Sequence, residues 1–69
     1  MQELKNVRQN KNFSCREMAE QLNISKPFYW QLENNKRRIS YEMAFKIANI
    51  LETTPDALFY KEFKNKVKF

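Results

Sequence analysis

The side chains with the clearest chemical potential in this sequence are positively charged, and they form two clusters. One is the run Lys36, Arg37 and Arg38, and the other is a set of C-terminal lysines, Lys61, Lys64, Lys66 and Lys68. The chain has 13 lysines and arginines against 8 acidic residues, a net charge of +5. A basic excess gathered in patches predicts a polyanionic partner, either nucleic acid or an anionic membrane surface. The alternative is that these charges only keep the chain in solution.

Residue types that perform acid–base or metal chemistry are scarce. The sequence contains no histidine and a single cysteine, Cys15. Without histidine, the usual Cys/His zinc sites and the hydrolases that use a histidine base are excluded. We therefore expect no enzymatic activity, no metal and no cofactor. Cys15 is expected to be a half-buried thiol or a small contact residue, because it has no histidine to activate it as a nucleophile.

The length of the chain limits what it can contain. Its 69 residues make one small domain, near the lower limit for a chain that folds alone. Such a domain has no room for a large catalytic cleft or for a separate ligand-binding domain. No apolar run approaches the ~20 residues of a membrane span, and no signal peptide is recognisable. We expect no membrane partner and a location in the reducing cytoplasm.

Helical spacing of apolar residues dominates a chain that has no glycine and only two prolines. It predicts five short helices, over about residues 2–10, 14–22, 25–33, 40–51 and 54–59. Ser14, Ser25 and Ser40 are predicted N-caps, whose side chains accept hydrogen bonds from free N–H groups of the first turn. Glu17 completes a capping box with Ser14, and Thr54 before a proline opens the last helix.

Only Asn23, Ile24 and Ser25 separate the second and third predicted helices, which is a helix-turn-helix layout. Several stretches carry a further similarity, namely Ser14–Ala19, Ile24–Ser25, Leu32–Arg37, Ile47–Leu51 and Thr54–Leu58. In order and at this spacing they resemble the Cro/repressor type of helix-turn-helix proteins, the Xre-like or lambda-repressor-like DNA-binding domains. The resemblance runs from about Leu4 to Phe59. It implies an all-α fold and DNA binding.

The sequence departs from the family pattern at several positions. Cys15 stands where glutamine is usual, and Ile39 stands where proline is usual. Asn23, Asn35 and Glu52 stand where glycine is common. Asparagine tolerates a left-handed backbone, whereas glutamate at position 52 is expected to carry some strain.

The resemblance also implies a structural ion pair between Arg8 and Glu33. In the family these positions lock the first helix to the third and are largely buried. An unpaired buried charge costs about 3–5 kcal/mol, so the pair is expected to act on stability rather than on DNA. The alternative is two solvated surface charges.

The third predicted helix is the candidate recognition helix. Helical spacing turns Tyr29, Leu32 and Glu33 inward, which centres the opposite face on Pro27 and Gln31. Gln31 suits a bidentate contact with N6 and N7 of adenine, although it can also be an ordinary solvated residue. We predict that the base contacts come from one set of residues on this helix, Lys26, Pro27, Phe28, Trp30 and Gln31.

Trp30 favours a second interpretation of what the protein does. Three adjacent aromatic residues, Phe28, Tyr29 and Trp30, cannot all face one core, so an outer one is exposed unless a partner covers it. Exposed tryptophan is enriched at protein interfaces. The alternative function is therefore a protein-interaction module, such as an antitoxin or a regulator that binds a protein partner through Trp30 and the tail.

The predicted phosphate contacts flank the recognition helix. The basic loop after this helix approaches the DNA backbone in the family, and the N-terminus of the second helix offers N–H groups. The predicted set is Ser14, Cys15, Asn34, Lys36, Arg37 and Arg38. The alternative for the basic run is a solvated loop.

Residues 61–69 are predicted to form a basic-aromatic tail after a domain of residues 1–60. The tail fits a helix or a strand, or it is a frayed segment that touches DNA nonspecifically. One domain of this size covers a half-site, so operator binding usually needs two copies. We predict a homodimer whose interface draws on one set of apolar residues, Ile50, Leu58, Phe59, Phe63 and Val67.

Together these observations predict an all-α, compact bundle of about five short helices that contains a helix-turn-helix, with a short C-terminal extension. The predicted function is that of a sequence-specific, double-stranded DNA-binding transcriptional regulator. It would be a repressor or Cro-like protein of phage or mobile-element type, acting as a dimer on a pseudo-palindromic operator.

Overall fold

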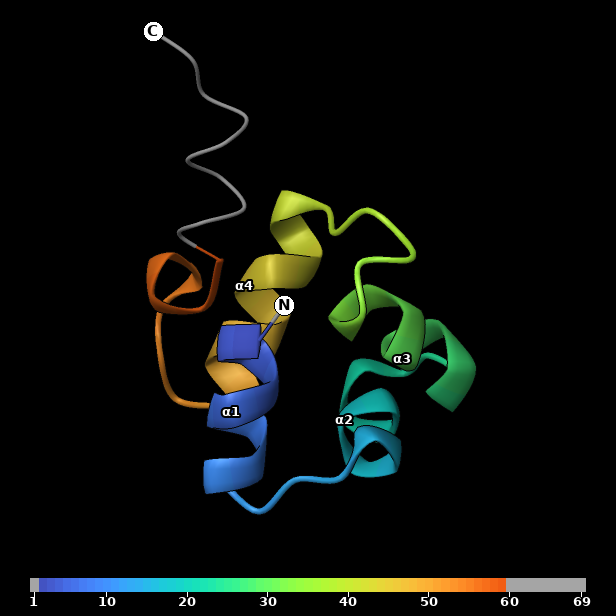
Figure 1. Ribbon diagram of the computed structural model, residues 1–69, viewed down its shortest axis with the longest axis horizontal. Helices are drawn as coiled ribbons and strands as arrows, with labels where there is room; N and C mark the ends of the chain where they lie inside the picture. Colours follow the sequence, from blue (N-terminus) through green and yellow to red (C-terminus); the bar gives the residue numbers. More distant parts are fainter. Residues whose placement is uncertain (1, 60–69) are drawn as a thin grey trace, which may run out of the picture.

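The computed structural model describes residues 2–59, which fold into a small helical bundle (Figure 1). Its four helices are α1 (Gln2–Asn10), α2 (Cys15–Leu22), α3 (Lys26–Glu33) and α4 (Tyr41–Ile50). A fifth helical segment begins at residue 55 and continues to residue 59, and no strand occurs within the described range. The predicted all-helical class is confirmed. The predicted tail, with Phe63 and Val67, lies outside the described residues.

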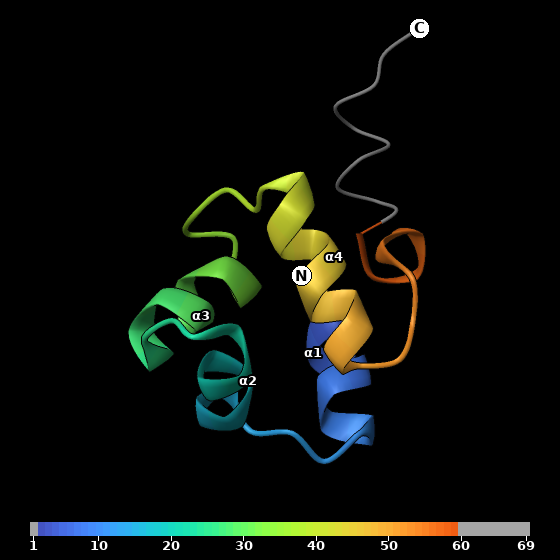
Figure 2. The same cartoon turned by 180° about the vertical axis from the view of Figure 1, so that it is seen from behind.

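The bundle has two sides, which can be followed from both directions. α2 and α3 lie together on one side, and α1, α4 and the fifth helical segment lie on the other (Figures 1 and 2). α2 packs against both α3 and α4, and α1 packs against α3. None of the helices within residues 2–59 has the length and apolar character needed to cross a membrane.

Each helix after the first begins at the cap that the sequence predicts. Ser14, Ser25 and Ser40 have extended backbones, and each side chain accepts a hydrogen bond from the backbone N–H three residues later, at 3.0, 3.2 and 3.1 Å. The N–H of Ser14 in turn donates to Glu17 Oε1 at 2.9 Å, which completes the capping box. Thr54 caps the fifth helical segment in the same way, at 3.3 Å. The caps fix where each helix starts.

Within residues 2–59, four residues adopt positive φ values, in a chain without glycine. Asn12, Asn23 and Asn35 have φ values of 64°, 59° and 59°, and asparagine is the residue type that tolerates this region best after glycine. Glu52 has a φ of 56°, which places a Cβ where the resemblance implies glycine. The expected left-handed backbone at position 52 is therefore present. Asn12, in the connection between α1 and α2, was not singled out from the sequence.

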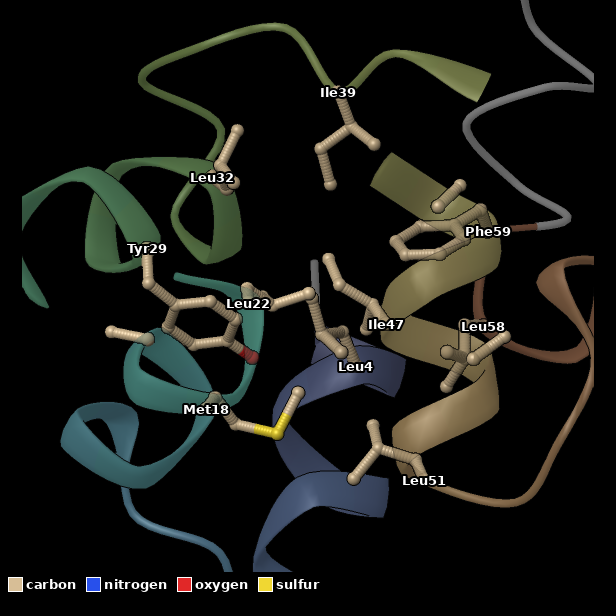
Figure 3. Close-up of a cluster of buried hydrophobic side chains, with 13 residues drawn as sticks. Leu4, Met18, Leu22, Tyr29, Leu32, Ile39, Ile47, Leu51, Leu58 and Phe59 are labelled. Atoms are coloured by element: carbon tan, nitrogen blue, oxygen red, sulfur yellow. The ribbon is translucent and has the colours of Figure 1, made fainter. Parts of the chain in front are cut away.

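One apolar core joins all these elements (Figure 3). It is built from buried side chains, Leu4, Met18, Ala19, Leu22, Tyr29, Leu32, Ile39, Ala44, Ile47, Ala48, Leu51, Leu58 and Phe59. Figure 3 shows the Tyr29 ring entering the core from α3, between Met18 and Leu22 of α2. Since α3 contributes its inward side chains to this core, its outward face has a fixed direction.

Leu58 and Phe59 require a correction to the predicted dimer interface. Their exposed fractions are 2% and 1%, and both side chains belong to the core (Figure 3). A side chain with so little exposed surface has nothing to offer a second copy. These two residues fit a structural role within the protomer instead. Ile50 is half-buried against the same core.

Candidate functional site

The turn between α2 and α3 is held by backbone hydrogen bonds. Asn23, in a left-handed conformation, donates its N–H to the carbonyls of the last turn of α2. The N–H of Ile24 donates to Ala19 O at 3.0 Å, and the Ile24 side chain packs against the core. Ser25 then caps α3. These contacts fix the orientation of α3 relative to α2.

The faces of α3 follow the prediction. Tyr29, Leu32 and Glu33 are buried, so the predicted inward face is confirmed. The five predicted base-contact residues lie on the other sides of this helix: Lys26, Pro27 and Trp30 are exposed, and Phe28 and Gln31 are half-buried. The structure thus gathers the five on one short helix. Their contact with DNA stays a prediction.

Trp30 has 48% of its surface exposed. Its neighbour Tyr29 enters the core, and Phe28 is half-buried against it. As expected, the three aromatic residues do not all share one core, because Trp30 lies outside it. A large apolar side chain on the outward part of α3 suits contact with a thymine methyl group or with a protein surface.

Arg37 reaches back from the loop onto α3. Its Nε donates a hydrogen bond to Gln31 Oε1 at 3.0 Å, and its guanidinium carbon lies 4.7 Å from the centroid of the Phe28 ring. Arg37 is one of the predicted phosphate contacts, and the sequence does not predict this arrangement. The structure instead brings Arg37 together with two of the predicted base-contact residues, Phe28 and Gln31.

The loop after α3 turns sharply back on the helix. Asn34 donates from its side chain to Trp30 O at 2.9 Å, and the N–H of Lys36 donates to Gln31 O at 2.8 Å. Asn35 between them is left-handed. Lys36 and Arg38 are exposed and form no ion pair within residues 2–59. Their charges are therefore available to an anion beside α3.

The N-terminus of α2 is less open to phosphate than the sequence suggested. The Ser14 N–H is already bonded to the Glu17 carboxylate, whose negative charge lies at the same helix end. The Ser14 hydroxyl oxygen accepts the cap hydrogen bond, which leaves its own proton free to donate. Cys15 is half-buried. A contact with phosphate here would use the Ser14 hydroxyl and the free N–H groups of the first turn.

A buried ion pair fixes the other end of α3. Arg8 donates from Nε to Glu33 Oε2 at 2.8 Å and from Nη2 to Glu33 Oε1 at 3.0 Å. Its Nη1 donates to Phe13 O at 2.7 Å, which ties the α1–α2 connection to the same group. The hydrogen bond with Glu33 raises the pKa of Arg8, so the guanidinium stays charged. The pair lies inside the bundle and not on the outward face of α3.

The Tyr29 hydroxyl is buried beside this pair. Burial, and then the charge of the Glu33 carboxylate, raise the pKa of Tyr29 well above its usual value. Yet no well-formed hydrogen bond reaches this hydroxyl from the described residues. Removal of this hydroxyl should therefore change the free energy of unfolding only slightly.

An exposed aromatic pair lies on α4, and the sequence analysis did not single it out. Tyr41 and Phe45 are 67% and 44% exposed, and their rings meet edge to face with centroids 5.0 Å apart. The four-residue spacing of these aromatic residues was the available signal. Glu42 and Lys46 form an ion pair on the same helix at 3.4 Å.

Comparison with known proteins identifies a family. A family model described as a helix-turn-helix domain matches residues 2–62. The match includes α1 to α4 and both sides of the turn between α2 and α3. Neither the curated proteins nor the solved structures give a match.

Proposed function

This chain belongs to the helix-turn-helix domain family, and on that basis we propose that it is a sequence-specific regulator of transcription that binds double-stranded DNA. In this proposal it acts in the cytoplasm as a repressor or Cro-like protein of phage or mobile-element type. Two copies occupy a pseudo-palindromic operator and block or redirect RNA polymerase.

The observation that carries the proposal is the surface made by α3 and the loop after it. α3 presents Lys26, Pro27, Trp30 and Gln31 outward from a helix that is fixed at both ends, by the Ser25 cap and by the Arg8–Glu33 pair. A recognition helix lies in the major groove and reads base edges chiefly with its N-terminal residues. This surface therefore has the polar and apolar groups that base edges require.

Lys36 and Arg38 supply the phosphate contacts in this proposal. Both are exposed and next to the C-terminal end of α3, where a groove-bound helix has the DNA backbone beside it. Such contacts give affinity and register without sequence preference, and they make binding weaken as salt rises. The Ser14 hydroxyl, on the other side of the turn, is a further hydrogen-bond donor to phosphate.

The dimer part of the proposal rests on the size of the domain. One copy covers one half-site, and two copies on half-sites one helical turn apart, ~34 Å, bind an operator with useful affinity. With Leu58 and Phe59 in the core, the predicted interface residues that remain are Ile50, Phe63 and Val67. Sedimentation of the full chain and of a chain ending at Tyr60 tests the tail. An unchanged oligomeric state removes the tail from the interface.

A second candidate function rests on Trp30. Its 48% exposure, on a helix otherwise suited to DNA, favours a protein partner. The alternative proposal is an antitoxin, or a regulator that binds a protein partner through Trp30 and the tail. Trp30→Ala separates the two proposals. Loss of discrimination between DNA sequences favours DNA contact, whereas unchanged DNA binding assigns Trp30 to another role.

Selection from random duplex DNA tests the main proposal. The full chain is incubated with a random duplex library, and the bound fraction is amplified and sequenced over several rounds. We expect an enriched motif with two related half-sites. A library that stays random after selection at moderate salt would contradict sequence-specific binding.

A further inference from the structure

We propose that Arg37 reads a base directly, and that it recognises guanine next to the base pair that Gln31 contacts. The reading surface then extends beyond α3 into the loop that follows it. This inference rests on the proposed function, because it concerns how the same surface selects its DNA.

The position of the guanidinium is set by two contacts with the recognition helix. Arg37 Nε donates to Gln31 Oε1 at 3.0 Å, and the guanidinium carbon lies 4.7 Å from the centroid of the Phe28 ring. Phe28 and Gln31 are three residues apart on α3, so they are neighbours on its surface. Arg37 therefore lies against the helix instead of extending into solvent from the loop.

The contact leaves the two terminal nitrogens of the guanidinium free to donate hydrogen bonds. Nε is engaged by Gln31, whereas Nη1 and Nη2 have no hydrogen-bond partner within residues 2–59. Two parallel N–H groups of this end match O6 and N7 of guanine in the major groove. A guanidinium already held in place also loses less side-chain entropy on binding than a flexible one.

Gln31 keeps its own reading capacity in this arrangement. Arginine can only donate, so the Gln31 atom that faces Arg37 must be the carbonyl oxygen, and its amide nitrogen points elsewhere. The oxygen has a second lone pair for adenine N6, and the amide group can donate to adenine N7. Gln31 and Arg37 thus form a linked pair that suits two adjacent base pairs.

A phosphate contact would need a different side-chain position. Phosphates line the rim of the groove, whereas Arg37 is bound to Phe28 and Gln31 of α3. Arg38, the next residue, is exposed and has no ion pair or hydrogen bond among the described residues. It provides a matched control at the same loop and with the same charge.

The test compares the parent chain with Arg37→Lys and Arg38→Lys by selection from random duplex DNA, followed by affinity measurements on single-base variants of the selected motif. Lysine keeps the positive charge but loses the Nε donor and the planar fork. Arg37→Lys should lose about 10- to 100-fold of the preference for guanine at one position in each half-site, with an unchanged salt slope. Arg38→Lys should select the parent motif.

The outcomes separate this inference from the function on which it depends. If the parent selects a motif and Arg37→Lys retains the guanine preference at every position, Arg37 is not a reader, although the proposed function stands. If Arg37→Lys weakens all sequences equally, Arg37 is a phosphate contact and the inference is likewise overturned. If the parent itself selects no motif, the proposed function fails together with the inference. Far-UV circular dichroism of both variants checks that the fold is kept.

Discussion

Arg8 in α1 and Glu33 at the end of α3 are joined by two hydrogen bonds of 2.8 and 3.0 Å inside the bundle. The pair connects residues that are far apart in the sequence and fixes the helix on which the proposed reading surface is built. Both side chains are buried, away from the exposed residues of that helix. The effect of the pair on DNA binding is therefore expected to be indirect, through the stability and position of α3.

Arg8→Met should lower the free energy of unfolding by about 3–5 kcal/mol, because it leaves the Glu33 carboxylate buried without its partner. Urea denaturation measures the change. The double variant Arg8→Met/Glu33→Leu should recover much of the loss, since it removes both charges. A loss below about 1 kcal/mol in the single variant would show that Glu33 does not depend on Arg8.

Tyr29→Phe should leave stability at pH 7 within about 1 kcal/mol of the parent, because the hydroxyl that it removes is buried without a well-formed hydrogen bond among residues 2–59. The two chains should diverge at high pH. The raised pKa of Tyr29 means that the folded state keeps a proton that the unfolded chain loses above about pH 10, so stability falls as pH rises further. Unfolding between pH 8 and 11 should show a smaller decline for Tyr29→Phe. Parallel declines would contradict a raised pKa.

Glu52→Gly should raise the free energy of unfolding by about 1 kcal/mol, because glycine adopts the observed φ of 56° without the cost that a Cβ brings. Lys5→Gly is the matched control. Lys5 lies exposed within α1, where glycine should instead lower stability by about 0.5–1 kcal/mol. Thermal or urea unfolding of both variants checks the opposite signs. Destabilisation by Glu52→Gly would mean that the glutamate side chain has a stabilising role.

The sequence predicts the helices well because their signals are local. Each serine cap lies directly before a helical apolar pattern, and both the cap and the pattern depend on residues within one or two turns. The burial of Tyr29 and Leu32 follows from the same spacing. The resemblance to the family supplies the Arg8–Glu33 pair, which no local signal contains.

The contacts that the sequence could not predict depend on the direction of loops. Arg37 meets Gln31 because the chain reverses at the left-handed Asn35, and helical spacing no longer applies after that point. The sequence analysis predicts Leu58 and Phe59 as part of a dimer interface. In the structure they complete the core, an outcome that depends on where the segment after α4 packs.

Gln31→Ala should relax base preference at one position in each half-site by about 1–3 kcal/mol, with the fold intact. The physical reason is the loss of an amide that donates to and accepts from one base. Affinity for single-base variants of the operator measures the effect, and Gln21→Ala, exposed on α2, is the control. Equal discrimination by Gln31→Ala and the parent would remove Gln31 from the base contacts.

Lys36→Ala and Arg38→Ala should weaken binding to all sequences alike. Each loses one phosphate contact, so the slope of log affinity against log salt should fall by about 1 in each variant. Titration of one operator at several salt concentrations gives the slope. Lys5→Ala, on α1 and away from the proposed surface, should leave it unchanged. An unchanged slope in the Lys36→Ala/Arg38→Ala double variant would place the loop away from DNA.

The central claim is that α3 and its following loop select a DNA sequence, and one ratio tests it most directly. This ratio is the affinity of the full chain for the selected duplex divided by its affinity for a scrambled duplex of the same length and composition, at ~150 mM salt. A sequence-specific regulator should give a ratio of about 10³ or more. A ratio near one would mean that the chain binds DNA only through charge, and it would contradict the account.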